Sequence, residues 1–235
     1  MFEKLHTTKL SGAGSIFLLL LFVFACREGD KKTKPAEQQG VGKTATAIGQ
    51  PVKTVLFFGN SLTAGYGLDP SESFPSLIQQ KIDSTHLNYK SVNAGVSGET
   101  SAGGNARIDW ILKQPVDVFV LELGANDGLR GIPVAETRKN LQSIIDKVKA
   151  KNPQVELVLA GMQVPPNMGQ KYANDFRKMF PDLAEKNDMV LVPFLLEGVG
   201  GVRALNQADA IHPTAEGARI VAQNVWSVLE PVLKK

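Results

Sequence analysis

From Val52 onward, short apolar runs alternate with longer amphipathic stretches, and this alternation constrains the fold more than any other feature of the chain. Short apolar runs bounded by turn residues are typical of buried strands, and apolar positions three and four apart indicate helices. Strands are expected at residues 53–58, 90–94, 116–123, 156–160 and 189–193, and helices at 73–83, 105–113, 134–151, 172–187 and 214–229. Strands separated by helices pair in parallel, so the pattern predicts an α/β domain with a five-stranded parallel sheet covered on both faces.

The composition fits one globular domain. With 235 residues, of which 43% are hydrophobic and 21% charged, the chain is long enough to bury a sizeable core. The formal net charge is only +3, and the Lys and Arg residues are scattered along the sequence instead of forming a basic stripe. A nucleic-acid partner is therefore not indicated.

The N-terminus has the organisation of a secretion signal. Two lysines precede an apolar run at residues 16–25 (IFLLLLFVFA), which is shorter than the ~20 residues that a transmembrane helix needs. Residues 23–26 (VFAC) resemble the bacterial lipobox, in which the signal peptide is cut before a cysteine that is then lipidated. Residues 1–25 are therefore expected to be a lipoprotein signal peptide and Cys26 the lipidation site, with ordinary secretion or an uncleaved anchor as alternatives.

Residues 26–51 carry few large apolar side chains, so burial cannot offset the entropy of ordering them. They are expected to form a flexible tether with a typical reach of roughly 25–30 Å, followed by a single folded domain at 52–235. Cys26 is the only cysteine, which excludes an intramolecular disulfide and a cysteine-based metal cluster. Arg27 stands where many lipoproteins of the inner membrane have Asp, so by this resemblance the protein is expected in the bacterial cell envelope, anchored to the outer membrane and facing the periplasm.

Three segments that follow predicted strands are rich in glycine and small polar residues. Ligand sites of parallel sheets form beyond the carboxyl ends of the strands, so these segments are the expected place for chemistry. The first holds Ser61, either as a nucleophile or merely as the cap of the next helix. The second holds Gly98, where glycine allows a backbone conformation that points an N–H into a site. The third holds Asn126, whose carboxamide can donate to an oxyanion, although an ordinary turn is the more common meaning of such a segment.

Asp209 and His212 precede the last predicted helix. A carboxylate three residues before a histidine can bond to its Nδ1 and leave Nε2 free to take a proton from a serine. His6 lies in the predicted signal and His86 in a short loop after the first predicted helix. His212 is therefore the histidine that is suited to act as a base.

Together these segments resemble the SGNH or GDSL hydrolase family, and the resemblance extends over nearly all of residues 52–229. The matching blocks are Gly59-Asn60-Ser61-Leu62, Gly98, Gly124-Ala125-Asn126-Asp127 and Asp209-Ala210-Ile211-His212. Residues 121–131 (LELGANDGLRG) are most similar to the bacterial arylesterase and acyl thioesterase/lysophospholipase subgroup. The resemblance implies a three-layer α/β/α, flavodoxin-like fold with strand order 2-1-3-4-5, no cofactor and no metal.

The activity that the resemblance implies is hydrolysis of a carboxylic ester, thioester or lysophospholipid through an acyl-enzyme. Ser61, His212 and Asp209 would form the triad, and the Ser61 and Gly98 N–H groups with the Asn126 side chain the oxyanion hole. The alternatives are a carbohydrate O-acetylesterase on the same fold and a non-catalytic binding lipoprotein. The family usually has Asp at the position of Asn60, and this departure is expected to retune the site without inactivating it.

The loop after the fourth predicted strand is similar to the acyl-binding loop of that subgroup. It contains Met162, Val164, Pro165 and Met168, and unbranched Met side chains suit a groove for flexible chains. The alternative is that these side chains only hold the loop on the sheet. The expected partners are thus a small-molecule or lipid ester and, through Cys26, a membrane, and the chain is expected to be monomeric.

Overall fold

The computed structural model describes residues 51–235, so the predicted signal peptide, nearly all of the tether and Cys26 lie outside the described residues. Five strands form one parallel sheet in the order β2-β1-β3-β4-β5. The strands are β1 (Lys53–Gly59), β2 (Tyr89–Gly95), β3 (Val118–Glu122), β4 (Glu156–Ala160) and β5 (Val190–Val192). The predicted sheet and strand order are confirmed.

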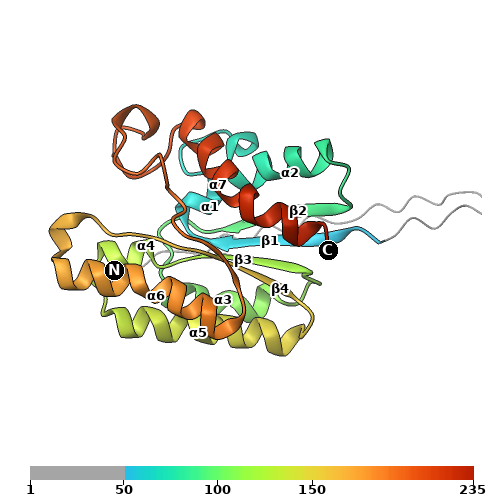
Figure 1. The fold of residues 1–235 in the computed structure, drawn as a ribbon, viewed down its shortest axis with the longest axis horizontal. Coiled ribbons are helices and arrows are strands. Elements are labelled where there is room, and N and C mark those ends of the chain that lie inside the picture. The colour runs from blue at the N-terminus through green and yellow to red at the C-terminus, as the bar shows by residue number, and fades with distance from the viewer. Residues whose placement is uncertain (1–50) are drawn as a thin grey trace, which may run out of the picture. The chain divides into compact units, whose positions relative to one another are not determined.

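Helices cover both faces of the sheet. The helices are α1 (Ser61–Ala64), α2 (Phe74–Ser84), α3 (Ser101–Ile111), α4 (Ala125–Leu129), α5 (Val134–Lys151), α6 (Gln170–Asn187) and α7 (Ala215–Leu233). Short 3-10 turns lie at Pro70–Glu72, Pro166–Met168 and Arg203–Leu205. Figure 1 shows α1, α2 and α7 on one side of the sheet and α3, α5 and α6 on the other, which makes the predicted three-layer α/β/α arrangement. Among residues 51–235, no helix has the length and apolar character to cross a bilayer.

The two central strands carry the core. Phe57 and Phe58 of β1 and Phe119 and Leu121 of β3 are fully buried. Because helices cover both faces, these strands appear in the sequence as continuous apolar runs and not as alternating ones. Both strands end on the same side of the sheet, called here the carboxyl edge. The segments that follow β1 and β3 therefore begin side by side at this edge.

Helix α3 begins at Ser101, four residues before the predicted start. Gly103 and Gly104 lower the helix propensity of this segment, so the pattern favoured a later start. In the structure the Thr100 side chain caps the helix by accepting from the Gly103 N–H. A Cβ on Gly104 would collide with Leu123 of the central layer, so glycine lets the helix approach the sheet.

Helix α4 is absent from the sequence-based prediction, which treated this glycine-rich segment as a turn. It is stabilised by Asp127, a carboxylate with only 1% exposure. Asp127 accepts from the Ser101 backbone N–H at 2.8 Å and from the Thr137 hydroxyl at 3.3 Å. A single buried carboxylate therefore joins α3, α4 and α5 directly behind Asn126.

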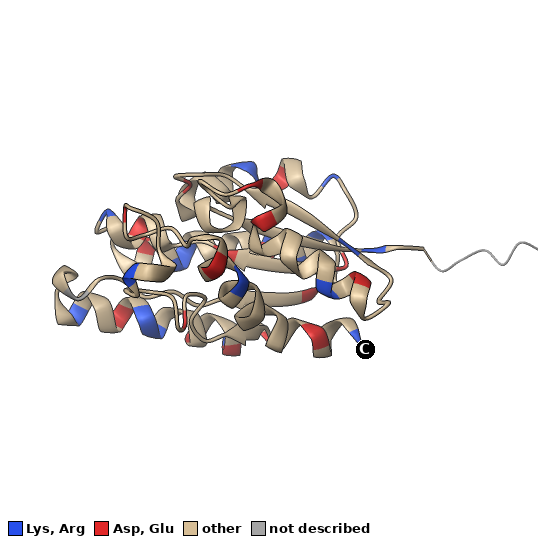
Figure 2. Cartoon of the chain, turned by 90° about the horizontal axis from the view of Figure 1, so that it is seen from above, with Lys and Arg blue, Asp and Glu red and all other residues tan. Residues whose placement is uncertain are grey.

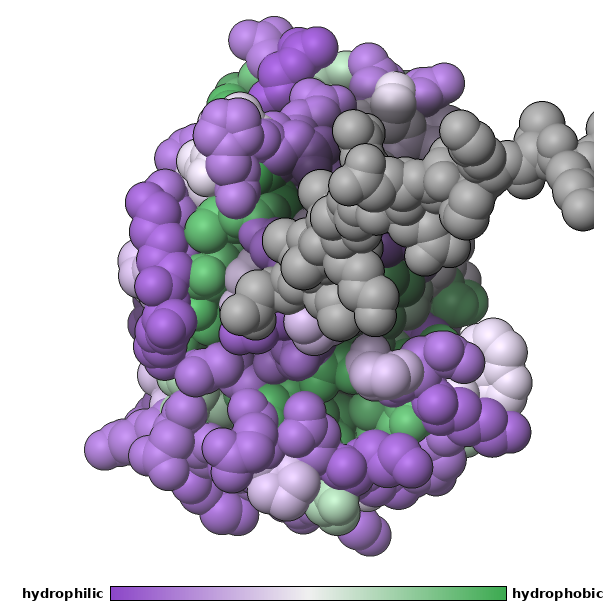
Figure 3. Space-filling view, turned by 90° about the vertical axis from the view of Figure 1, so that its right-hand side faces the viewer, coloured by the Kyte–Doolittle hydropathy of each residue, from purple (hydrophilic) through white to green (hydrophobic). Residues whose placement is uncertain are grey.

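The end of the sheet where the strands begin has a different surface. The chain enters β1 at Lys53, at the end opposite the carboxyl edge. Figure 3 views the domain from this side and shows hydrophobic residues in hollows between hydrophilic ones. Val52 is 62% exposed, and Trp110 near the end of α3 is 69% exposed. In the view of Figure 2, acidic and basic residues are interspersed over the domain.

Candidate active site

Ser61 lies at the carboxyl edge, two residues after β1, and is only 8% exposed. It is the first residue of α1, where a backbone N–H has no acceptor within the helix. The turn before it is so tight that a Cβ on Gly59 would collide with the Thr63 hydroxyl and the Glu122 carboxylate. The Asn60 side chain closes the turn by accepting the backbone N–H two residues later at 2.9 Å.

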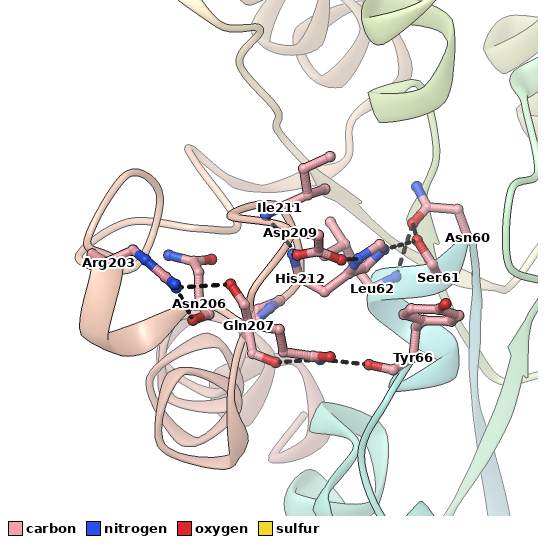
Figure 4. Close-up of polar contacts among 11 residues, drawn as sticks. Asn60, Ser61, Leu62, Tyr66, Arg203, Asn206, Gln207, Asp209, Ile211 and His212 are labelled. Atoms are coloured by element: carbon pink, nitrogen blue, oxygen red, sulfur yellow. Dashed lines mark hydrogen bonds and ion pairs between the residues drawn. The ribbon is translucent and has the colours of Figure 1, made fainter.

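His212 lies in the loop between β5 and α7, and the structure brings it against Ser61. Its Nε2 is 2.8 Å from the Ser61 Oγ, and its Nδ1 is 2.6 Å from the Asp209 Oδ2 (Figure 4). An ionised carboxylate only accepts hydrogen bonds, so Nδ1 carries the proton and Nε2 accepts from the serine hydroxyl. The three side chains thus form a continuous hydrogen-bonded series.

Hydrogen bonds hold the pKa of Asp209 at about 2, below its ordinary value of 3.8. The bond to the His212 side chain has the largest effect, followed by the bonds from the Ile211 and His212 backbone N–H groups at 2.9 and 3.0 Å. Asp209 is therefore ionised at neutral pH. An ionised carboxylate at Nδ1 stabilises the protonated imidazole that forms when His212 accepts a proton.

Gly98 lies on the loop after β2, and Asn126 is the second residue of α4, the short helix after β3. Gly98 has φ +79°, which favours glycine, although a Cβ there would meet nothing within 4 Å. Its carbonyl accepts from the Arg130 guanidinium at 3.1 Å, which orients the peptide. The Asn126 Nδ2 donates to the Glu99 carbonyl at 3.0 Å and retains a second N–H for another acceptor.

An ion pair holds the Gly98 loop beside the end of β1. Arg107 of α3 bonds to both carboxylate oxygens of Glu99, each at 2.6 Å. The same guanidinium donates to the Ala94 carbonyl at 2.8 Å and lies 4.0 Å from the centroid of the Phe58 ring. The sequence-based prediction missed this pair, because no local spacing indicates that two residues eight positions apart meet across a loop and a helix.

Glu122, the last residue of β3, supports the turn that carries Ser61, and the sequence-based prediction also missed it. Its buried carboxylate accepts from the Asn60 Nδ2 at 2.7 Å, the Asn60 N–H at 3.1 Å and the Thr63 hydroxyl at 2.8 Å. Burial raises the pKa of Glu122 to about 7, and these hydrogen bonds oppose the rise. A charged residue inside the apolar run 118–123 was the available signal, since a buried charge usually has partners with a role.

The predicted acyl-binding residues do not share one environment. Met162 is only 4% exposed and belongs to the core, so its side chain offers little surface to a substrate, and its contact with an acyl chain stays a prediction. Val164 and Met168 are half-buried, and Pro165 is exposed. Cβ atoms added at two glycines of the segment after Asn126 would meet Val164 and Met168, so these side chains lie over that segment. Among residues 51–235, no three His, Cys, Asp or Glu side chains are grouped to hold a metal ion.

A profile of the GDSL-like Lipase/Acylhydrolase family matches residues 57–220, a segment that runs from within β1 to within α7 and contains the whole candidate site. The chain belongs to this family. It is 41% identical over 182 residues to the esterase TesA of Pseudomonas aeruginosa, which covers 77% of this chain and 90% of that protein. It is 38% identical over 181 residues to thioesterase 1/protease 1/lysophospholipase L1 of Escherichia coli, which covers 77% and 85%.

A solved structure supports the same assignment. The crystal structure of the psychrotrophic esterase EstA from Pseudoalteromonas sp., inhibited by monoethylphosphonate, matches with a TM-score of 0.73. The two chains are 32% identical, and the match covers 78% of this chain and 100% of that one. This GDSL-family chain is a serine-type carboxylic ester hydrolase, as the sequence predicted, and neither a carbohydrate deacetylase nor a non-catalytic binding lipoprotein is favoured.

Asn60→Asp, which restores the usual family residue, is expected to keep activity within about tenfold near pH 6, or ~1.4 kcal/mol, and to become less stable as pH rises. In the wild type, the pKa of Glu122 is raised from 4.5 to about 7. The stability linked to its proton is present below pH 4.5 and is lost as pH rises through about 7. The substitution would place a second carboxylate at the 2.7 Å contact, so the pair would share one proton and the loss would extend to higher pH.

Urea unfolding of wild type and variant from about pH 5 to about pH 8 measures this effect. The matched control is the double variant Asn60→Asp/Glu122→Gln, which exchanges donor and acceptor across the same contact. Its stability should depend less on pH than that of either protein, because Glu122 no longer titrates. An Asn60→Asp profile parallel to that of the wild type would contradict the expected coupling.

Proposed function

We propose that Ser61 is the nucleophile, His212 the general base and acid, and Asp209 the residue that orients His212 in this ester hydrolase. The observation that carries the proposal is the series Ser61 Oγ to His212 Nε2 at 2.8 Å and His212 Nδ1 to Asp209 Oδ2 at 2.6 Å. Both distances lie within hydrogen-bond reach, the first between a nucleophile and its base and the second between that base and the group that orients it.

In the proposed reaction, the Ser61 oxygen attacks the ester carbonyl carbon while His212 Nε2 takes the hydroxyl proton. The Ser61 and Gly98 N–H groups and the free N–H of Asn126 stabilise the negative charge that develops on the carbonyl oxygen. The C–O bond to the leaving group then breaks, and His212 returns the proton to the departing alcohol. Water repeats these steps on the acyl-enzyme, which releases the acid and regenerates Ser61.

Covalent trapping tests this assignment directly. An activated ethylphosphonate ester should transfer one phosphonyl group to the peptide that contains Ser61, with loss of activity in proportion to the label. Mass spectrometry of the digested protein identifies the modified residue. The Ser61→Ala protein should remain unlabelled, and a label on another serine would refute the assigned nucleophile.

The substrate is proposed to be an ester with an apolar acyl chain that lies along Val164, Pro165 and Met168. Support comes from the half-buried positions of Val164 and Met168 over the segment after Asn126. A thioester or lysophospholipid has the same acyl group, and the names of the Escherichia coli relative point in that direction. An acyl chain on these side chains would extend from the carbonyl carbon over the α4 side of the site.

For a series of p-nitrophenyl esters, kcat/KM is expected to rise from acetate to chains of middle length and then level off. Each buried methylene should contribute at most ~0.8 kcal/mol, or about fourfold. Val164→Asp should flatten this rise and leave acetate hydrolysis nearly unchanged, because the charge disfavours apolar contact. Gln163→Asp, an exposed neighbour, is the matched control. A wild-type preference for acetate with no response to Val164→Asp would contradict the acyl-contact proposal.

Residues 1–25 are proposed to direct export and Cys26 to carry the lipid that anchors the enzyme at the outer membrane, with 52–235 as the catalytic domain. The proposal is supported by the charged start, the apolar run and the cysteine that follows it. The domain is proposed to act as a monomer.

Cys26→Ser is expected to move the protein from the membrane fraction to the soluble fraction of the envelope. Stable anchoring takes more than one acyl chain, and the modified cysteine supplies them. Fractionation followed by immunoblotting and an esterase assay measures the distribution. Full retention of Cys26→Ser in the membrane fraction would instead indicate an uncleaved N-terminal anchor.

A further inference from the structure

The contact between Ser61 and His212 joins the start of α1 to the loop before α7, across 151 positions of the sequence. The His212 loop leaves β5 and is largely exposed from residue 200 to 211, so core packing contributes little to its position. A base on such a loop needs bonds to the serine side of the site, since small displacements of catalytic groups reduce rates strongly.

Gln207 makes such a connection. Its side-chain Nε2 donates to the Tyr66 carbonyl at 2.7 Å and to the Pro213 carbonyl at 2.9 Å (Figure 4). Its backbone N–H donates to the His212 carbonyl at 2.7 Å. One amide therefore bonds simultaneously to the loop after Ser61 and to the residue after His212. Both partners of Nε2 are carbonyl oxygens, which only accept, so the orientation of the amide is fixed.

The serine side of this connection is tightly packed. Tyr66 donates its backbone N–H to the Ser61 carbonyl at 3.0 Å, so Gln207 bonds to a residue already tied to the nucleophile. A Cβ on Gly67 would collide with the Gln207 side chain, so the two segments meet without space between them. The Tyr66 ring also lies against the His212 ring, with 4.7 Å between the centroids.

Side-chain hydrogen bonds within the His212 loop hold the segment around Gln207 in place. The Asn206 side chain donates to the Val199 and Val202 carbonyls at 2.7 and 2.8 Å. Arg203 donates to the Gln207 carbonyl at 3.1 Å. A movement of Gln207 would therefore be transmitted to the backbone that carries His212.

We propose that Gln207 is a positioning residue that holds the His212 Nε2 at bonding distance from the Ser61 Oγ by joining the two loops through its side-chain amide. The proposal rests on the proposed triad, because it assigns Gln207 a role only through His212. It goes beyond the triad because the distance between His212 and Ser61 would then depend on the Gln207 amide, a donor that touches neither the substrate nor the reacting atoms.

Gln207→Glu tests the amide with almost no change of shape. It replaces the donating NH₂ by an oxygen that faces two carbonyl oxygens, and it keeps the backbone bonds. The expected result is a kcat lower by about 10- to 100-fold with KM for p-nitrophenyl esters little changed. The activity ratio of variant to wild type should rise as pH falls, because a protonated Glu regains one donor. Gln154→Glu adds the same charge at an exposed position and should have wild-type kinetics.

Gln207→Ala covers the case in which the charge prevents folding, because it removes both side-chain bonds without adding a charge. It should also lower kcat at temperatures well below its melting transition. Wild-type kcat in Gln207→Ala, or a loss confined to KM in either variant, would overturn the proposal. The Ser61→Ala protein separates the two levels: if it is inactive while the Gln207 variants match wild type, only the positioning role fails, and if it is active, the triad fails.

Discussion

Ser61→Ala is expected to reduce kcat by about 10⁴- to 10⁶-fold, the range typical of nucleophile and triad removal in serine hydrolases. The Ser61 hydroxyl is the only nucleophile in contact with His212 among the described residues, and its removal leaves no group to form the acyl-enzyme. The fold should persist, because the turn is closed by Asn60 and Glu122 and not by the serine hydroxyl. Steady-state hydrolysis of p-nitrophenyl acetate and a thermal melt measure the two effects.

The control for this prediction is His212→Ala, alone and combined with Ser61→Ala. Nucleophile and base act as one unit, so each single variant should lose nearly as much activity as the double variant. A double variant far worse than either single one would show that the two residues act independently. Activity close to wild type in either single variant would remove that residue from the mechanism.

Asn126→Ala is expected to lower kcat by about 10²- to 10³-fold, or ~2.7–4 kcal/mol. The Asn126 amide makes one bond to the Glu99 carbonyl. In the proposed mechanism its second N–H donates to the oxyanion, where negative charge appears only as the reaction proceeds. The loss should therefore appear in kcat more than in KM, because the interaction is stronger in the transition state than in the bound substrate.

The bond to Glu99 provides the comparison for this variant. Asn126→Ala leaves the Glu99 carbonyl without this donor, so part of the loss could come from movement of the Gly98 loop. Arg107→Lys weakens the support of the same loop without touching the donor. Asn126→Ala should cost more in kcat than Arg107→Lys. An effect of Asn126→Ala on KM alone would identify Asn126 as a substrate-binding residue.

The strands of the sheet and the pair of Asp209 and His212 were predictable because their signals are local, whereas the strand order was implied by the resemblance to a family. Apolar runs such as the one in β3 are continuous in sequence, and Asp209 lies three residues from His212. The contact of Ser61 with His212 is not local, and its prediction came from the resemblance to a family and the edge at which parallel strands end.

The supporting contacts were not predictable for the opposite reason. Glu122 lies 62 residues from Asn60, and Gln207 lies 141 residues from Tyr66. Neither pair belongs to a motif with fixed spacing, so only the folded chain shows that they meet. The sequence left open whether Met162 lines a groove or holds the loop on the sheet, and in the structure its side chain packs in the core.

The direction of β1 has a practical consequence. The strand runs from Lys53 to Gly59, so the point where the polypeptide enters the domain and Ser61 lie about 20 Å apart along the strand, at opposite ends. An enzyme attached through its N-terminus, on a bilayer or on a chromatography bead, would therefore have Ser61 at the end of the domain remote from the attachment. Esters dissolved in the surrounding liquid would reach Ser61 without passing the point of attachment, which makes oriented immobilisation through this end preferable to random coupling through surface lysines.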